Sequence, residues 1–313
     1  MGEGMVKVAE ISHVTFECPD LDVMESFLVD FGLLRVSRAG DALYMRGAGP
    51  HAYCYVARKA SRHAFAGVAL RAAREDELAA AAAIPGAQSV QALDGPGGGE
   101  SIMLRDPVGI PVQIVYGIEP AAALPMREPL AINFAREKHR RGGTQRIPKG
   151  PAQILRRGHV LFFASDFNRT RDGWCQHLDM LPSDYIHAGT ADNQLGGFLR
   201  CNRGAEFTDH HTVALFGGPV PKLHHCSFEI RDLDARILGN EWLVAKGDKH
   251  AWGIGRHTLG SQIFDYWYDP HGVIMEHYAD GDLFDASNPA ESHHIGPESL
   301  FQWGPPPPAV FLR

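Results

Sequence analysis

The same order of strand and helix patterns occurs in both halves of the chain. In ISHVTFECPDLDVMESFLVDFGLL, apolar and polar residues alternate up to a turn at Pro19-Asp20, and the residues that follow have the apolar spacing of an amphipathic helix. RRGHVLFFASDFNRTRDGWCQHLDML repeats this order in the second half. His13 and His159 fall at matching places in the two segments. The pattern therefore predicts an internal duplication.

A second strand and helix follow in each half, in FAGVALRAAREDELAAAAA and in HHCSFEIRDLDARILGNEWL. Shorter strands such as DALYMRG and GGFLRCN come after the first helix of each half. Each half closes on an Asp-Pro-x-Gly turn into a final strand, so that Gln113 in the first half takes the place of Glu276 in the second. Four such modules predict an α+β fold in which mixed sheets curl, with helices outside, and enclose a concave face.

A basic stretch with Gly and Pro divides the two halves. The length of 313 residues suits two domains, each large enough to bury a core. We expect an N-terminal domain over 1–135, a linker over 136–153, a C-terminal domain over 154–290 and a Pro-rich tail over 291–313. A solvated linker is a better interpretation of the basic stretch than a binding patch.

Composition narrows the class of protein. No apolar run approaches the roughly 20 residues that span a bilayer, and the N-terminus lacks the apolar core of a secretory signal, so we expect no membrane segment and a cytoplasmic location. A net charge of −7 disfavours nucleic-acid binding. The five cysteines are scattered singly, which predicts reduced thiols without a disulfide framework or a thiolate zinc site.

Three potential metal ligands come from corresponding strands of the second half. His159 and His225 each open the first strand of a module, and Glu276 lies on the last strand. Two neutral imidazoles and one carboxylate form the facial triad of non-haem Fe(II) oxygenases, which leaves positions open for substrate and oxygen. Zinc can also accept such a set.

The first half lacks the full set of ligands. It keeps His13 but has Gln113 instead of the carboxylate, and Phe65 or Ala66 falls where a second histidine is needed. We therefore expect no metal in the first half.

The segment GRHTLGSQIFDYWYDPHGVIME contains a more specific pattern. The spacing of His257, Tyr266, the turn Asp269-Pro270-x-Gly272 and Glu276 resembles the signature of the type I extradiol ring-cleavage dioxygenases, members of the vicinal oxygen chelate superfamily. The likeness extends to DHHTVALFG, LHHCSFEI and GHVLFF, and thus covers the whole second half. The first half is similar to the family's inactive domain.

This resemblance implies a fold, a reaction and partners. The fold is the two-domain vicinal oxygen chelate fold, with four βαβββ modules paired into two curled mixed sheets. The reaction is extradiol cleavage of a catechol in aromatic catabolism, at an Fe(II) centre for which Mn(II) is the alternative ion. The implied partners are a small aromatic diol and O2, and the implied assembly is a homo-oligomer. Neither nucleic acid nor membrane is expected as a partner.

The resemblance also assigns roles to residues. His159, His225 and Glu276 match the metal ligands, His211 the acid–base catalyst near oxygen, and His257 and Tyr266 the groups that hydrogen-bond the catechol oxygens.

Two pairs of adjacent histidines require a choice. We choose His225 over His224 because the internal repeat aligns His225 with His159. We choose His211 over His210 because His211 holds the family's place three residues before Ala214.

The substrate pocket departs from the best-known family pattern. Leu259-Gly260 follows His257-Thr258 where many relatives have Asn-Asp, and Asp265 precedes Tyr266 where Phe is common. We expect the carboxylate of Asp265 to point away from the face of Tyr266.

The segments HTLGSQIFDYW and QWGPPPPAVFL are most similar to the branch of the family that cleaves dihydroxy-cumate and other substituted catechols. A carboxylate on the substrate would need a cation, for which the candidates are Arg200, Arg203, Lys249 and Arg256, although surface roles are the better interpretation for them. Two alternatives to ring cleavage remain: a non-redox metalloenzyme of the glyoxalase or epimerase type, and a metal-free small-molecule binding protein with the same fold.

Overall fold

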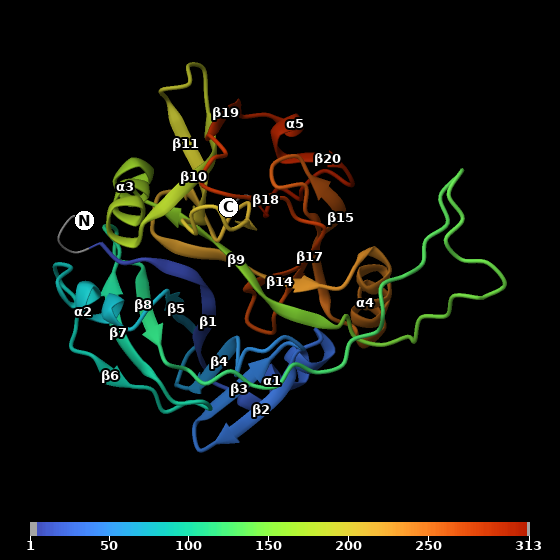
Figure 1. Ribbon diagram of the computed structural model, residues 1–313. Coiled ribbons are helices and arrows are strands. Elements are labelled where there is room, and N and C mark those ends of the chain that lie inside the picture. The colour runs from blue at the N-terminus through green and yellow to red at the C-terminus, as the bar shows by residue number, and fades with distance from the viewer. Residues whose placement is uncertain (1–4, 312–313) are drawn as a thin grey trace.

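The first half of the chain forms one eight-stranded sheet with two helices (Figure 1). A computed structural model of the chain describes residues 5–311. The elements of this half are β1 Val8–Cys18, α1 Leu21–Asp30, β2 Leu34–Ala39, β3 Ala42–Arg46, β4 Tyr55–Lys59, β5 Ala64–Ala72, α2 Asp76–Ala82, β6 Gln91–Ala92, β7 Glu100–Arg105 and β8 Pro111–Tyr116.

The second half forms a ten-stranded sheet and a small two-stranded ribbon, β12-β18. Its elements are β9 Ile154–Ala164, α3 Phe167–Leu178, β10 Met180–His187, β11 Gln194–Cys201, β12 Thr208–Asp209, β13 Val213–Gly217, β14 Lys222–Ile230, α4 Leu233–Lys246, β15 Lys249–His257, β16 Ile263–Tyr268, β17 Ile274–Ala279, β18 Leu283–Phe284, β19 Glu291–His294, α5 Pro297–Leu300 and β20 Phe301–Trp303.

The strand order confirms the predicted duplication. The first sheet runs β2-β3-β4-β1-β5-β8-β7-β6, and the second contains the same order as β10-β11-β13-β9-β14-β17-β16-β15. In both sheets the two central strands are antiparallel, whereas each pairs in parallel with the last strand of its own module. Each half therefore consists of two βαβββ modules, as the sequence predicts.

Aspartates start three of the helices. Asp20, Asp166 and Asp232 have extended backbones, and their side chains accept hydrogen bonds from main-chain N–H groups of the first turn. These bonds satisfy donors that have no partner inside the helix. The strand-to-helix switch is thus encoded locally at the same place in three modules.

The two sheets share one continuous core. Phe31, at the end of α1, packs edge-on against Phe228 of β14 with ring centroids 5.7 Å apart, and Phe65 packs against Phe162 at 5.6 Å. Helix α3 packs on β9, β10, β11 and β13, and α4 packs on β15, β16 and β17. The face of the second sheet opposite these helices is left for the pocket described below.

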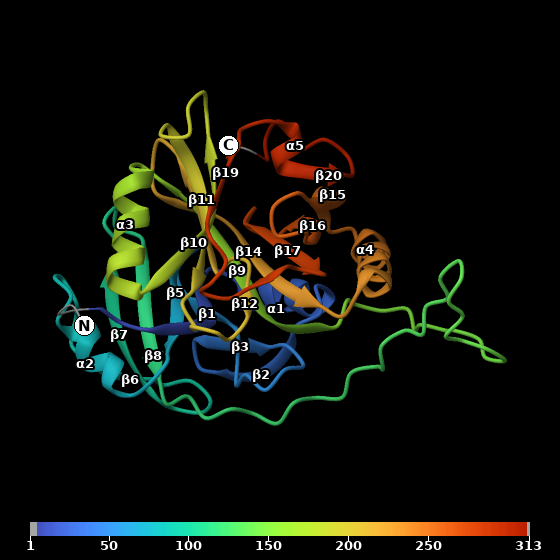
Figure 2. The ribbon, with the colours of Figure 1, turned by 45° about the horizontal axis from the view of Figure 1, so that its top comes forward.

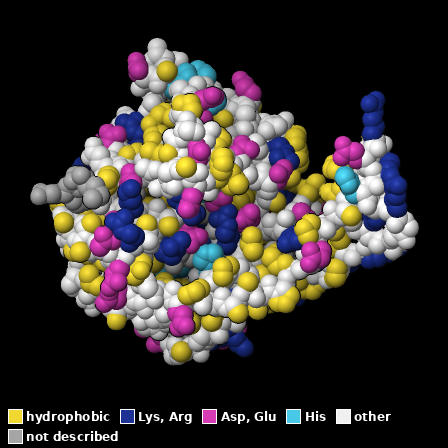
Figure 3. Space-filling model, viewed as in Figure 1, with side chains coloured by type: hydrophobic (Ala, Val, Ile, Leu, Met, Phe, Trp, Pro, Cys, Tyr) yellow, Lys and Arg dark blue, Asp and Glu magenta, His cyan; other side chains and the backbone are white. Residues whose placement is uncertain are grey.

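The stretch between the halves projects from the body as an extended arm (Figures 1 and 2). Most of its residues over 121–150 are exposed, and Figure 3 shows Lys and Arg side chains gathered along it.

The last part of the chain joins the second sheet. β19 pairs with β10 at one edge and β20 pairs with β15 at the other, so this segment links the two edges of the sheet.

Candidate metal centre and adjoining pocket

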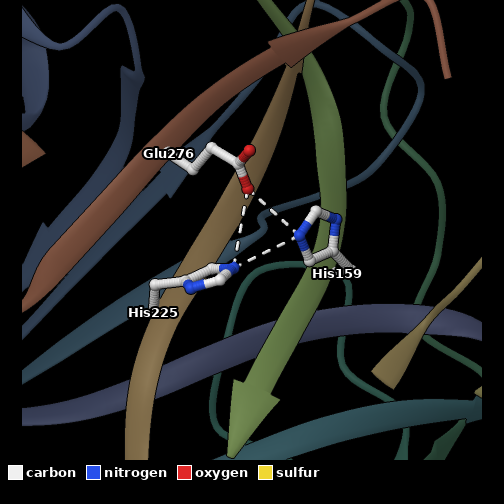
Figure 4. A group of neighbouring side chains, drawn as sticks. All are labelled: His159, His225 and Glu276. Carbon is white, nitrogen blue, oxygen red and sulfur yellow. Dashed lines mark hydrogen bonds and ion pairs between the residues drawn. The ribbon is translucent and has the colours of Figure 1, made fainter. Parts of the chain in front are cut away.

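Three neighbouring strands bring His159, His225 and Glu276 together. β9, β14 and β17 lie side by side, and the three side chains point toward one another (Figure 4). His159 Nε2 lies 3.0 Å from Glu276 Oε2 and 3.3 Å from His225 Nε2, and the distance from His225 Nε2 to Glu276 Oε2 is 3.6 Å. The structure thus gathers the three ligands that the resemblance implies.

These distances fit a single metal ion. Adjacent ligand atoms that lie roughly 2.1 Å from a common ion are separated by about 3 Å. All three residues are buried, and Glu276 Oε1 has no hydrogen-bond partner within the described residues. An unpartnered buried carboxylate oxygen is costly, and a cation would satisfy it.

The protonation states also suit a metal. Burial holds the pKa of His225 well below its ordinary value, so its imidazole is neutral at pH 7. Burial opposes ionisation of Glu276, yet the adjacent His159 holds the pKa of this carboxyl below its usual value. The centre therefore presents an imidazole lone pair and a carboxylate, which are the forms that bind a metal.

His224, the alternative to His225, orients its neighbour instead. Its Nε2 donates to the carbonyl of Phe311 at 2.5 Å, so in the neutral ring Nδ1 is an acceptor. His225 Nδ1 lies 2.8 Å from this atom and donates to it. The bond leaves the lone pair of His225 on Nε2, which faces His159 and Glu276. Such outer hydrogen bonds fix the tautomer of a ligand.

The pair His210 and His211 repeats this arrangement. His210 Nε2 donates to Asp184 Oδ2 at 2.6 Å, and the two Nδ1 atoms of the pair are 3.0 Å apart. His210 Nδ1 accepts from His211, which leaves a lone pair on His211 Nε2. The His211 ring lies 4.1 Å from that of His159, and burial holds its pKa well below the ordinary value. His211 is thus a neutral base beside the centre.

His257 and Tyr266 form a third polar group at the centre. His257 Nδ1 donates to the carbonyl of Leu300 at 2.8 Å, and its Nε2 accepts from the Tyr266 hydroxyl at 2.8 Å. Burial and the nearby Glu276 raise the pKa of Tyr266 well above 10, so the phenol stays protonated. Because His257 Nε2 is 3.9 Å from Glu276 Oε1, this pair borders the metal ligands.

A cavity of about 820 Å³ opens on these groups. His159, His225, His211, His257 and Tyr266 all line it. Its other walls come from β9, β11, β13 and the C-terminal segment, and they are mainly aliphatic and aromatic.

Comparisons with known proteins agree with this geometry. No family model matches the sequence. The chain is 30% identical over 312 residues to metapyrocatechase 2 of Cupriavidus necator, a match that covers 98% of this chain and 92% of the relative. The chain belongs to the type I extradiol dioxygenases. Biphenyl-2,3-diol 1,2-dioxygenase of Paraburkholderia xenovorans (strain LB400) is 26% identical over 184 residues, which cover 56% of this chain and 53% of that relative.

Solved structures show the fold of this dioxygenase. Homoprotocatechuate 2,3-dioxygenase from Brevibacterium fuscum superposes with a TM-score of 0.83 at 18% identity, covering 100% of this chain and 93% of that chain. The Mn(II)-bound glyoxalase from Novosphingobium aromaticivorans gives 0.80 at 22%, covering 97% and 94%. The predicted vicinal oxygen chelate fold is confirmed. In residues 5–311 of the dioxygenase, no helix is both long and apolar enough to cross a membrane.

The prediction for Asp265 of the dioxygenase is confirmed. Its carboxylate accepts hydrogen bonds from Asn240, His250 and Trp267, and it does not line the cavity that Tyr266 lines.

Four partners of the centre were not predicted from the sequence. Ser227 Oγ lies 2.8 Å from His159 Nε2 and donates to Glu276 Oε2. It shares a strand face with His225, and that was the one available signal for it. Asp184, Phe311 and Leu300 come from distant parts of the chain.

The first half places different residues at the matching positions. β5 and β14 have equal lengths and equivalent neighbours, so Gly67 corresponds to His225. The expectation of Phe65 or Ala66 at this place was wrong by one or two residues. The strand register is the same in both halves, with Val68 opposite Val14 and Cys226 opposite Val160, but the chain between the two strands is shorter in the first half. Ala69 pairs with both His13 and Gln113, as Ser227 pairs with Glu276.

His13 takes the place of His159 in the first half. It is buried, and this burial lowers its pKa to about 3. The unfolded chain binds a proton near pH 6.5 whereas the folded chain does not, so the contribution of His13 to stability is present above pH 6.5 and is lost as the pH falls toward 3. Between pH 8 and pH 5, His13 should therefore lower the free energy of unfolding by about 2 kcal/mol. We expect this part of the pH dependence to be absent in His13→Gln.

Urea denaturation at the two pH values measures this difference. His139→Gln is the control, because the His139 side chain is 55% exposed. An equal pH dependence in the wild-type and His13→Gln proteins would contradict the prediction.

Proposed function

We propose that this dioxygenase cleaves a substituted catechol beside its diol, using O2, at a mononuclear Fe(II) centre held by His159, His225 and Glu276. The observation that carries the proposal is the convergence of these two imidazoles and one carboxylate within 3.6 Å of one another. A metapyrocatechase at 30% identity over nearly the whole chain supports it. Mn(II) is the alternative ion.

The metal and the chain contribute differently. Iron, when bound, supplies a redox-active centre at which a catechol and O2 are brought together. The chain holds the diol in one orientation next to that centre, which is a large part of the rate enhancement. Its mainly apolar walls also limit water around the reacting groups.

Tyr266 and His257 are suited to orient the diol. The Tyr266 phenol stays protonated, and its hydroxyl lies in the cavity next to the metal ligands. It can donate a hydrogen bond to an oxygen of the diol while His257 holds it in place. His257 keeps its own orientation through the Leu300 carbonyl.

His211 is suited to move a proton. Its Nδ1–H is held by His210, so Nε2 carries the lone pair and can take a proton from a hydroxyl of the diol. The same atom can return that proton later in the reaction. Asp184 supports this role, because it fixes the tautomer of His210.

We assign catalysis to the second half alone. In the first half His13 keeps one histidine, but Gly67 replaces the other and Gln113 replaces the glutamate, so these residues cannot hold a metal in the same way. We also propose a cytoplasmic location, which the five free cysteines support.

A non-redox reaction of the glyoxalase type is the second candidate, because a Mn(II)-bound glyoxalase has a similar fold. Such enzymes usually share four ligands across modules. Within residues 5–311, the ligand group here contains three residues, and all come from one sheet. The Tyr266 and His257 pair also favours ring cleavage.

One experiment tests the proposal against this candidate. The protein is loaded anaerobically with Fe(II) or with Mn(II) and then mixed with catechols in air, while oxygen uptake and product absorbance are recorded. We expect a yellow ring-opened product that carries both atoms of O2, detected by mass. Turnover of a hemithioacetal without oxygen uptake would support the glyoxalase type instead.

A further inference from the structure

The cavity beside the metal centre has walls built from alternate residues of several strands. Leu161 and Phe163 share a face of β9 with His159, whereas the residues between them lie in the core. Leu195 and Phe198 of β11 and Phe216 of β13 extend this wall.

The C-terminal segment supplies the opposite wall. Ile295, Pro297 and Phe301 line the cavity from the stretch around α5, and Pro306 and Phe311 line it from the end of the described chain. Phe311 contacts the rings of both His224 and Tyr266. The cavity is therefore lined by apolar side chains on both sides of the metal ligands.

The polar side chains outside the metal centre are neutral. Gln194, Gln262 and Ser299 are among the lining residues. Within residues 5–311, the lining contains no Lys, Arg, Asp or Glu. Glu276, which belongs to the centre, lies behind the lining residues His159 and His257, at 3.0 and 3.9 Å from their Nε2 atoms.

The four candidate cations are engaged elsewhere. Arg200 donates to the carbonyls of Pro182, Asp285 and Asn288, and Lys249 lies over the Tyr268 ring.

The remaining cations have acidic partners. Arg203 pairs with Glu206, and Arg256 pairs with Asp280. Arg171, which donates to Gln194 at the cavity wall, is 2.7 Å from Asp172. None of these arginines lines the cavity.

The volume of the cavity is a second, independent indication of the kind of substrate. A cavity of about 150 Å³ is enough for a benzene ring. The cavity here is about 820 Å³, so an unsubstituted catechol would fill only a small part of it. Apolar walls gain by contact with apolar groups, whereas an unpaired carboxylate loses its hydration there without compensation.

We propose that the substrate is a neutral catechol with an apolar substituent about as large as a second aromatic ring. This proposal rests on the proposed ring-cleavage function and narrows it. It places the substituent between the wall of β9, β11 and β13 and the C-terminal segment. Among the described residues, the lining offers no cation for the carboxylate that dihydroxy-cumate carries.

A substrate panel tests the proposal with the iron-loaded full-length protein. We expect kcat/KM for biphenyl-2,3-diol to exceed that for 3-methylcatechol by roughly 10- to 100-fold. 3,4-Dihydroxyphenylacetate and 2,3-dihydroxybenzoate should be poorer than 3-methylcatechol. A preference for either carboxylated catechol, or equal values for all neutral catechols, would overturn the proposal and leave ring cleavage intact.

A charge variant tests the wall itself. Leu195→Arg places a cation in the half-buried lining, and Leu195→Met is the matched neutral control. The quantity compared is kcat/KM for 3,4-dihydroxyphenylacetate divided by kcat/KM for biphenyl-2,3-diol. We expect Leu195→Arg to raise this ratio by at least about 10-fold, whereas Leu195→Met should change it little. An unchanged ratio in a folded Leu195→Arg protein would count against substituent binding at this wall.

Binding without catalysis separates this proposal from the proposed function. Trp252 lines the cavity, so biphenyl should change the tryptophan fluorescence of the protein before iron is added, and Trp252→Phe should remove that change. If no catechol is cleaved but biphenyl binds, ring cleavage fails and the apolar pocket stands. Binding of benzoate in preference to biphenyl would overturn the pocket assignment.

Discussion

Glu276→Gln is expected to abolish metal retention and to lower ring cleavage by roughly 10³-fold or more. Glu276 is fully buried between two imidazoles, and it contributes the one negative charge among the three ligand atoms. The glutamine side chain has nearly the same shape but is neutral, so it loses the charge that holds a divalent ion. Gln113 is already present at the corresponding place in the first half.

The measurement is metal content per chain after anaerobic loading and desalting, together with oxygen uptake. Glu229→Gln is the matched control, because Glu229 lies on β14, shares a strand face with His225 and forms an ion pair with Arg156 rather than with the centre. We expect this control to retain the metal. A Glu276→Gln protein that kept one metal ion per chain and full activity would show that the ligands lie elsewhere.

The duplication and the ligand strands could be predicted because their signals are local. Alternation with a period of two identifies a strand face, and the Asp-Pro-x-Gly turn fixes where the last strand of each half begins. The position of Glu276 follows directly from that turn. The residue that corresponds to His225 in the first half was missed because the chain between the two central strands differs in length between the halves, so that counting residues along the sequence does not locate Gly67.

The partners that fix the histidine tautomers could not be predicted. Phe311 is 87 residues from His224, and Leu300 is 43 residues from His257. These contacts depend on how the C-terminal segment returns over the second sheet. The path of this Pro-rich segment cannot be predicted from its sequence pattern. For Arg200 the preferred interpretation as a surface residue was wrong: its side chain is buried and donates to main-chain carbonyls.

The two pairs of adjacent histidines have the same hydrogen-bond arrangement. In each pair, the first residue binds an outside acceptor through Nε2 and accepts through Nδ1 from the second residue. The second residue, His211 or His225, then has its lone pair on Nε2. In the proposed mechanism, His225 then binds the metal and His211 takes up a proton, and the two pairs differ in where the second ring points.

His211→Gln is expected to lower kcat by roughly 10²- to 10⁴-fold while metal content stays at the wild-type level. Glutamine can accept a hydrogen bond, but it cannot take up a proton near neutral pH. His211 does not belong to the ligand group of His159, His225 and Glu276, so its loss should leave the metal in place. Single-turnover kinetics and metal analysis on the same preparation measure both quantities.

Asp184→Asn separates proton transfer from simple packing. The amide can donate to His210 Nε2 where the carboxylate only accepts, and this would reverse the tautomer of His210 and remove the acceptor for His211 Nδ1–H. We expect kcat to fall by roughly 10- to 100-fold with little change in KM. If Asp184→Asn were fully active while His211→Gln was not, His211 would act without its partners. If both were fully active, the proton would have to pass through another group.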